Sequence, residues 1–439
     1  MRLRSLLLTL LLAPGAARAQ PRADDVASAS TLLVSSPNLV TWLRARSAGV
    51  RAATERTLQA QADARQAGVL PNPTLDLSLG GVPIGETNPP GLGISDTANF
   101  TVGLSETIEL GKRGPRTRAA ELRAHASAED GVGTLADRLG DARLALGKAV
   151  YARAKLGAVE ENLRAAHDLT TLEEARRKAG DISENELQRV VLDAQAVELD
   201  VAHGRADLAE ALAECRAVLE ARCDLDDAGV ELLDRAAELP AEIADPAAAL
   251  AERPDLRSLD LQRRGALEDA ELARNRVIPD PQIGVAFTAD GFTASGNDPR
   301  TLTFNVGIPL AIFDTGKHDA AKAEAHAREL QATAHAALAL ARAGVDGLVD
   351  KRKYLEGAVG MLVADAIPRS QAVLESTRKA YETGHLSLSD LILVQRNHRE
   401  LVSKGLDLRF ELFQARNDLR RTLGLDAQAA RQEREERHP

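Results

Sequence analysis

Aromatic residues are scarce in this chain, where Phe, Trp and Tyr together make up 3% of 439 residues. Aromatic rings contribute much of the buried surface in a compact globular core, so their scarcity argues against a single thick core. A long helical assembly that packs through small residues fits this composition better.

Long apolar runs are missing after the first residues. No later window has the roughly 20 apolar residues that a membrane-spanning helix needs, and 27% of all residues are charged. If the chain enters a membrane, it must do so through strands of about 9 to 11 residues. The net charge of −10 argues against nucleic acid or an anionic lipid surface as a partner.

Patterns for catalysis and metal binding are also missing. The chain has no Gly-x-Ser-x-Gly, no His-Glu-x-x-His and no phosphate-binding loop. Its nine histidines are scattered, and His318 and His326 lie two helical turns apart, as on a solvated helix face. We therefore expect no enzyme activity, no cofactor and no metal site.

Only two cysteines occur, Cys215 and Cys223. Two cysteines alone do not make a zinc site. A disulfide between them is permitted in an exported chain, and the sequence leaves open whether they form this bridge or remain free thiols.

The first residues have the pattern of a secretory signal peptide. Arg2 and Arg4 precede a short apolar run from Leu6 to Leu12, and a small-x-small site ends at Ala19. The run is too short to span a bilayer. We expect cleavage after Ala19 and export of the mature chain.

About half of the chain is used twice. Four landmarks recur in the same order, displaced by 208, 205, 204 and 204 residues: Pro71-Asn72-Pro73 and Pro279-Asp280-Pro281, Gly111-Lys112 and Gly316-Lys317, Gly180 and Gly384, Arg216 and Arg420. Each unit is predicted to run helix, strand, loop, strand, very long helix, tight turn, long helix.

Four short stretches alternate apolar and polar residues, which places their apolar side chains on one face of a strand. They lie at about 72–80, 99–110, 281–288 and 301–310. A half-buried soluble sheet would give the same pattern. The export signal and the small or polar residues on the other face favour strands of a water-filled membrane barrel.

Two stretches, 115–178 and 317–383, have no strand-like alternation and are rich in helix formers. Each would extend about 100 Å as a straight helix at 1.5 Å per residue. A helix of this length needs neighbours, so we expect coiled-coil packing. Pro368 should bend or interrupt the second helix, because its ring removes a backbone donor.

The predicted organisation follows from these elements. It comprises a signal peptide at 1–19, a first repeat at 20–222 with a helical hairpin at 115–222, a linker or equatorial region at 223–250, a second repeat at 251–425 with a hairpin at 317–424, and a charged C-terminal tail at 426–439. Four membrane strands cannot close a barrel, and open edges in lipid are costly, so the chain must form oligomers of two or more copies.

The chain resembles the TolC-type outer-membrane efflux proteins from about Ser36 to Leu425. The resemblance rests on short motifs in a shared order: Pro71-Asn72-Pro73, Glu109 to Arg113, Arg253 to Leu256, Ile308-Pro309-Leu310, Phe313-Asp314, Gly316-Lys317, Tyr381, Gly384, Leu386-Ser387 and Asp390-Leu391. The segment from Glu109 to Arg113 is similar to the cation-efflux branch, typified by CzcC-like proteins. Many relatives carry a lipid-modified cysteine at the cleavage point, where this chain has Gln20, so an acyl anchor there is excluded.

This resemblance implies a mainly α fold with a small membrane β portion. A homotrimer would build a 12-stranded β-barrel in the outer-membrane lipid of a Gram-negative bacterium, continued by a 12-helix α-barrel in the periplasm. It would act as a passive exit duct for an inner-membrane pump of the RND type, joined through a periplasmic adaptor. The cation-efflux branch implies heavy-metal cations as cargo; the alternative is a drug-efflux or type I protein-secretion channel. A structural coiled-coil or adhesin-like protein is the competing class.

The resemblance also implies a periplasmic aperture at the two hairpin tips, Gly180 and Gly384. Asp390 would face the pore, with Glu186 as its counterpart in the first hairpin, and three copies would form a ring of carboxylates that attracts cations. The alternative is that both are solvated acids favoured by a helix N-terminus. Tyr381 matches an aromatic residue that ties the closed tip together, and its alternative role is interhelical packing.

A further acidic position of the family, one turn after Asp390, is occupied by Leu393. A double acidic ring is therefore in doubt for this chain.

Overall fold

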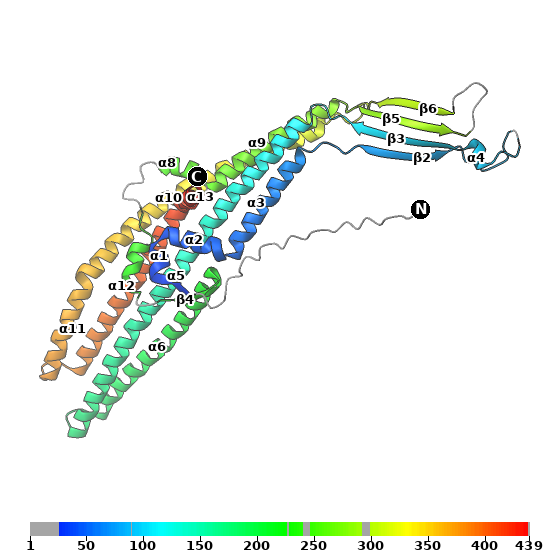
Figure 1. Cartoon of the computed structure of the whole chain (residues 1–439). Helices are drawn as coiled ribbons and strands as arrows, with labels where there is room; N and C mark the ends of the chain where they lie inside the picture. The colour runs from blue at the N-terminus through cyan, green and yellow to red at the C-terminus, as the bar shows by residue number, and fades with distance from the viewer. Residues whose placement is uncertain (1–25, 89, 226–227, 240–245, 292–298, 438–439) are drawn as a thin grey trace. The chain divides into compact units, whose positions relative to one another are not determined.

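The computed structural model describes residues 26–88, 90–225, 228–239, 246–291 and 299–437 (Figure 1). The predicted signal peptide at 1–19 and Gln20 lie outside these residues, as do parts of the linker, of the 290–300 loop and of the C-terminal end. Among the helices described, none combines the length and the apolar character that crossing a bilayer requires.

The chain divides into two units. Unit 1 contains residues 1–48, 138–238 and 352–417, and unit 2 contains residues 49–137, 239–351 and 418–439. Each unit therefore combines segments that are far apart in the sequence, and most elements belong to one unit alone.

Unit 2 contains a four-stranded antiparallel sheet in the order β2-β3-β5-β6. Its strands are β2 (Thr74–Gly80), β3 (Asn99–Thr107), β5 (Gln282–Asp290) and β6 (Arg300–Gly307). One row of directly paired residues crosses all four strands: Leu75, Leu104, Val285 and Phe304. Because paired residues share a face, the apolar residues gather on one side of the sheet, as their alternation predicted.

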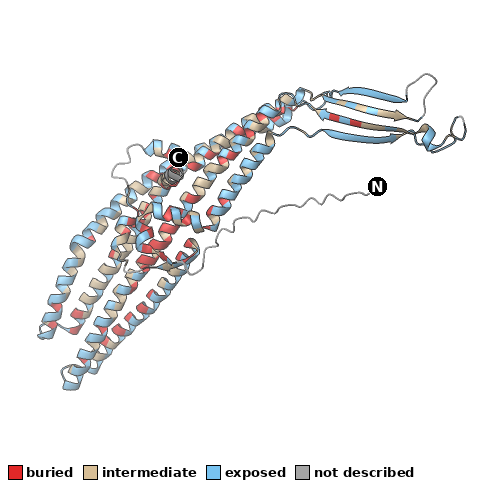
Figure 2. Ribbon diagram, viewed as in Figure 1, coloured by how far each residue is buried: buried red, intermediate tan, exposed pale blue. Residues whose placement is uncertain are grey.

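The two faces of the sheet differ in chemistry. The apolar face is largely exposed, with Leu77 at 64% and Phe304 at 77%, and Figure 2 shows most of the sheet as exposed. On the other face, Thr101 and Thr288 hydrogen-bond across the strands at 2.9 Å, and Ser105 donates to Asp76 at 3.2 Å. The sheet therefore has one polar face, on which side chains hydrogen-bond to one another, and one apolar face that is largely exposed.

Strand β3 ends at Thr107, three residues before the predicted end. The Ile108 amide still donates to the Pro281 carbonyl at 2.9 Å, but the Leu110 amide donates to the Asp280 carboxylate at 2.9 Å. A side chain has replaced the neighbouring strand as hydrogen-bond partner, so the ladder stops.

The repeated Gly-Lys motif forms the junction between β3 and the following helix. Gly111 has a φ of +72°, which favours glycine. The Lys112 ammonium donates to the Asp280 carboxylate at 2.6 Å and to the Ile278 carbonyl at 2.9 Å. Nearby, Arg116 pairs with Glu109 and donates to the Ala67 carbonyl at 2.8 Å. Motif residues of both repeats, Lys112 and Asp280, therefore connect the strands to the helix that follows β3.

The helices of unit 2 pack mainly through small residues. They are α3 (Ala48–Ala67), α8 (Pro246–Ala251), α9 (Pro254–Arg274), the first part of α5 (Arg113–Ala179) and most of α10 (Lys317–Met361). Ala266 of α9 is buried with Ala327 and Leu330 of α10. Alanine lets helix backbones approach closely, which explains how so few aromatic residues suffice.

The motif at Arg253 joins the start of α9 to the end of α12 (Leu388–Thr422). The Arg253 guanidinium donates to the Thr422 carbonyl at 2.7 Å and is held by Asp255. Pro254 occupies the first position of α9, where its missing N–H costs nothing. Arg253 therefore satisfies an otherwise orphaned carbonyl at a helix C-terminus.

The C-terminal residues, interpreted from sequence as a charged tail, instead form helix α13 (Leu425–Arg437). Ala427 and Ala430 are each 1% exposed, and the buried Asp426 pairs with Arg420 at 3.3 Å. The high charge of the segment concealed the short apolar stripe that docks it.

Unit 1 holds the two helical hairpins. Its elements are β1 (Val26–Ser28), α1 (Ala29–Val34), α2 (Ser36–Arg46), the rest of α5, α6 (Glu184–Leu219), β4 (Arg222–Asp224), α7 (Glu231–Ala236), α11 (Ile367–Glu382) and most of α12. β1 and β4 form a small parallel ladder in which Ala27 pairs with Cys223. The region predicted as a linker thus contains β4 and two short helices.

Pro368 interrupts the second long helix as predicted. α10 ends at Met361, a π-helical turn covers Leu362–Ala366, and α11 follows with Pro368 at its start. The Ile367 amide bonds to the Leu362 carbonyl, five residues back. The wider turn accommodates the proline ring, which has no N–H to offer residue 364.

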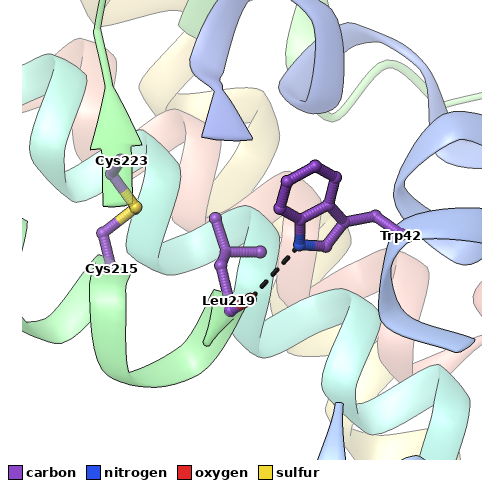
Figure 3. Close-up of a disulfide and its surroundings, with 4 residues drawn as sticks. All are labelled: Trp42, Cys215, Leu219 and Cys223. Atoms are coloured by element: carbon purple, nitrogen blue, oxygen red, sulfur yellow. Dashed lines mark hydrogen bonds between the residues drawn. A yellow bond between two sulfur atoms is a disulfide. The ribbon is translucent and has the colours of Figure 1, made fainter. Parts of the chain in front are cut away.

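A disulfide closes the end of α6 (Figure 3). Cys215 and Cys223 are bonded, which settles the alternative that the sequence left open. Between them, Glu220 adopts a φ of +51°, and its carboxylate accepts from the Ala48 amide at 2.7 Å. The Trp42 indole donates to the Leu219 carbonyl at 3.2 Å, as the dashed line in Figure 3 shows. The bridged segment therefore holds α2 and the start of α3 through these two hydrogen bonds.

Removing this bridge should destabilise unit 1. The disulfide closes a loop between residues eight apart, and loop-closure entropy assigns about 2.5 kcal/mol to a loop of this length. We expect Cys215→Ala combined with Cys223→Ala to lower the free energy of unfolding by about this amount, measured by denaturant titration. A reducing agent should produce the same loss in the native protein and no further loss in the variant. The prediction is contradicted if the reduced native protein and the variant both unfold at the same denaturant midpoint as the oxidised native protein.

Candidate functional site

The two helical hairpins turn at the glycines that the repeat singled out. At the first turn, the Gly180 amide donates to the Arg177 carbonyl at 3.1 Å and the Asp181 amide to the Arg176 carbonyl at 2.9 Å. Gly384 and His385 make the same pair of bonds to Tyr381 and Ala380, at 2.9 and 2.8 Å. Both are Schellman motifs, which require a left-handed residue, and the φ values are +88° and +78°.

The next helix begins with the same capping arrangement in both hairpins. Glu186 accepts from the Ser183 amide at 2.8 Å and returns its own amide to the Ser183 hydroxyl at 3.3 Å. Asp390 accepts from the Ser387 amide at 3.1 Å and from its hydroxyl at 2.6 Å. These are capping boxes, so each acid satisfies the start of α6 or α12.

The capping bonds favour the ionised carboxylates. Hydrogen bonds from the Ser387 hydroxyl and then its backbone N–H lower the pKa of Asp390, and the Ser183 backbone and then its hydroxyl lower the pKa of Glu186. The Asp390 side chain is exposed to solvent, and the Glu186 side chain is partly exposed. In the single chain, both acids therefore cap helix N-termini, which is the alternative to a pore ring that the sequence left open. A capping role is compatible with a position facing the pore and with a position facing bulk solvent.

The cap on α12 should depend on pH. A lowered folded pKa means that stabilisation is present above the unfolded pKa and is lost as pH falls through the folded one. We expect Asp390→Asn to speed amide hydrogen exchange in the first turn of α12 at neutral pH, and the difference from the native protein to vanish as the pH falls through the lowered pKa of Asp390. Equal exchange in both proteins at neutral pH would contradict this role of the carboxylate.

Tyr381 lies where the two hairpins pack together in unit 1. Its side chain is 4% exposed and belongs to a buried cluster with Val190 of α6 and with Leu388 and Leu391 of α12. The Arg176 guanidinium lies over its ring, 4.9 Å from the centroid. The predicted packing role of Tyr381 is therefore present in the single chain.

Sequence reasoning missed two charged groups close to this cluster. Glu173 of α5 is fully buried, and Asp193 of α6 is 8% exposed. Asp193 accepts from Arg396 at 2.7 Å and from Arg399 at 3.0 Å, which ties α6 to α12. Charged residues on a long polar helix give no sequence signal of burial, so neither could be distinguished from its solvated neighbours.

No three potential metal ligands come together anywhere in the part of the chain that the structure describes. The tips instead offer exposed carboxylates on capped helix ends above a buried aromatic and ionic cluster. Such an arrangement can attract cations and can hold or release helices, but it supplies no nucleophile for covalent chemistry.

Residues 246–425 match the family model described as "Outer membrane efflux protein". No curated protein matches the chain.

Several solved structures share the fold over nearly the whole chain. CusC is 18% identical, with a TM-score of 0.75, covering 88% of this chain and 91% of its own. The outer-membrane channel OprN is 19% identical, with a TM-score of 0.75 and coverages of 92% and 94%. The open-state MtrE channel of Neisseria gonorrhoeae is 18% identical, with a TM-score of 0.74 and coverages of 89% and 88%. At these identities the likeness shows the fold.

Proposed function

Because the chain belongs to the outer membrane efflux protein family, we propose that it is the exit duct of a tripartite efflux system. As a member of this family it is an outer-membrane channel that extends into the periplasm, and it is a passive conduit and not an enzyme. The finer proposal is a homotrimer that receives cargo from an inner-membrane pump of the RND type through a periplasmic adaptor.

The observation that carries the proposal is the amphipathic sheet with two free edges. Among the described strands, β2 and β6 each pair with a single neighbour, and the face shared by Leu75 and Phe304 is exposed and apolar. In lipid, each unpaired backbone group costs several kcal/mol. Further copies of the chain would pair these edges, and three copies would supply twelve strands.

We propose heavy-metal cations as the cargo, which rests on the similarity of Glu109–Arg113 to the cation-efflux branch. Deleting the gene and testing sensitivity to cobalt, zinc, cadmium, copper and a drug panel examines this directly. The expected result is sensitivity to metals alone. Sensitivity to dyes and antibiotics without a metal phenotype would overturn the metal assignment and favour drug efflux.

The aperture proposal assigns Asp390 to the pore, at the tip formed with Gly384. We expect Asp390→Ala to raise the leak, or to reduce the cation selectivity, of reconstituted trimers, because three carboxylates no longer attract cations. Glu186→Ala tests the counterpart position, since Glu186 occupies the same capping position in the first hairpin. Unchanged conductance and selectivity in Asp390→Ala would count against a pore-facing position.

A further inference from the structure

Within one chain, the two repeats meet at a junction that polar contacts hold together. The Lys112 ammonium donates to the Asp280 carboxylate at 2.6 Å and to the Ile278 carbonyl at 2.9 Å. The Leu110 amide donates to the same carboxylate at 2.9 Å. This first junction (Lys112, Ile278 and Asp280) connects the start of α5, in the first repeat, to the entry of β5, in the second.

The duplication provides the parts of this junction a second time. Lys317 is the counterpart of Lys112, because each directly follows a glycine with a φ of +72°. Asn72 is the counterpart of Asp280, because each is the middle residue of a repeated Pro-x-Pro motif. Lys317 follows β6 and Asn72 precedes β2, which are the two edge strands of the sheet. The second set of parts therefore lies at opposite edges of one chain and does not join within it.

These parts are exposed in the single chain. Lys317 and Asn72 are both exposed, and neither side chain has a hydrogen bond or an ion pair within the part of the chain that the structure describes. The segment before Lys317 exposes Phe313 at 99%, whereas Leu110, before Lys112, is 41% exposed. The second set thus lacks, in one chain, the partner that the first set has.

The two β-hairpins also match each other residue by residue. Ser78 pairs with Thr101 in the first hairpin, and Ala286 pairs with Thr303 in the second. Ser78 and Ala286 are 208 residues apart, as the Pro-x-Pro motifs are. Thr303 is therefore the counterpart of Thr101.

The pairing between the hairpins can be transferred to the free edges of the sheet. Gly103 of β3 lies opposite Ala286 of β5. Their counterparts are Asn305 of β6, two residues beyond Thr303, and Ser78 of β2. The repeat therefore places Asn305 of one copy opposite Ser78 of the next copy. Both lie on the polar face, so this register keeps each face continuous between copies, whereas a shift by one residue would not.

We propose that Lys317 of one copy docks on the strand entry of the next copy, where its ammonium donates to the Asn72 side chain and to the Leu70 carbonyl. Leu70 precedes Asn72 by two residues, as in the first junction. This inference rests on the proposed channel function, which requires several copies, and it names the residues through which they meet. The occupant is a second copy of this chain, because the first junction holds the same kind of lysine on the same kind of strand entry.

The two contacts differ in charge, which provides the test. The first junction pairs the ammonium with a carboxylate, whereas the contact between copies pairs it with a neutral amide. Asn72→Asp makes the two contacts chemically alike and changes one exposed side chain only. Oligomers purified from the outer membrane should then dissociate in detergent about threefold more slowly than the native protein at a fixed temperature, as one added exposed ion pair predicts.

Charge reversal provides the complementary measurement. Lys317→Glu should speed dissociation, and adding Asn72→Lys should slow it again, because the two side chains then carry opposite charges. Lys322→Glu is the matched control, since Lys322 is an exposed lysine on a different face of α10. It should dissociate at the native rate.

A cysteine pair tests the register independently. Ser78→Cys combined with Asn305→Cys should give disulfide-linked oligomers on electrophoresis without a reducing agent. Ser78→Cys with Thr301→Cys is the matched control, since Thr301 lies about 13 Å along β6 from Asn305, beyond the reach of a disulfide. Because β2 and β6 are opposite edges of the sheet, neither pair can bridge within one copy.

The outcomes separate the two proposals. Native protein that runs as a single chain in unheated detergent would overturn the channel function. Native oligomers in which Asn72→Asp leaves the dissociation rate unchanged, or in which the Asn305 pair does not cross-link, would overturn the contact proposed for Lys317 alone.

Discussion

Replacing Gly147 with alanine is expected to lower the free energy of unfolding by about 2 kcal/mol, although alanine is the better helix former. Gly147 lies on α5, where an added Cβ atom would clash with the ring of Phe413 on α12. Alanine in place of glycine gains about 1 kcal/mol in a helix interior, and overpacking costs about 1 to 3 kcal/mol or more. Phe413 is 1% exposed, so its ring has no room to move and the clash should dominate.

Gly157 supplies the matched control on the same helix. A Cβ atom there has no neighbour within 4 Å, so Gly157→Ala should stabilise the protein by about 0.5 to 1 kcal/mol. Adding Phe413→Leu to Gly147→Ala should recover part of the loss, because the smaller side chain vacates the space of the ring edge. Denaturant titration of the four proteins measures these effects. A stabilising Gly147→Ala would contradict the packing.

Replacing Asn417 with leucine is expected to cost about 3 kcal/mol. Arg143 of α5 is 1% exposed and donates to the Asn417 side chain at 3.0 Å, and Asn417 donates to the Gly140 carbonyl at 3.2 Å. Leucine is larger than asparagine, so it leaves no cavity, but it removes one acceptor of a buried guanidinium, which also donates to Ser36 at 3.4 Å, and the donor for a buried carbonyl. The loss therefore comes from polar groups left unsatisfied and not from a cavity.

Removing the charge as well should relieve much of this loss. A combination of Arg143→Met and Asn417→Leu places two apolar side chains of similar size at the contact, which is often nearly neutral for a buried ionic group. The double variant should thus be more stable than Asn417→Leu alone. A double variant that is less stable than Asn417→Leu alone would contradict this explanation.

The mainly α fold and its strands were predictable because their signals are local. Alternation along Leu75, Leu77 and Leu79 determines which side chains share a face, and the register of the sheet agrees with it. The positive φ at Gly111 and Gly180 likewise follows from a residue type that tolerates it. Pro368 acts through its own missing N–H, so the interruption near it needs no tertiary information.

Features that depend on distant partners were not predictable. Helix α13 packs through Ala427 and Ala430, whose small size gives no strong period. Glu173 is fully buried although its local sequence gives no sign of burial, and the parallel pairing of β1 with β4 joins two segments of unit 1 that are far apart in the sequence. The choice between a disulfide and two free thiols could be made only from the geometry at the end of α6.

At the tips, the residues were identified from the sequence, but their hydrogen bonds were not. The repeat selected Gly180 and Gly384, and the family resemblance added Asp390 and Glu186. All four have defined roles at helix ends. Their place around a pore depends on other copies of the chain and stays a prediction.

The central claim is that several copies of this chain form a channel in the outer membrane. Its most direct test is electrophoresis in detergent of the isolated outer-membrane fraction, with and without boiling. We expect a band at the mass of three chains that converts to one chain only on heating. A protein found in the soluble periplasmic fraction, running as one chain without heating, would contradict it.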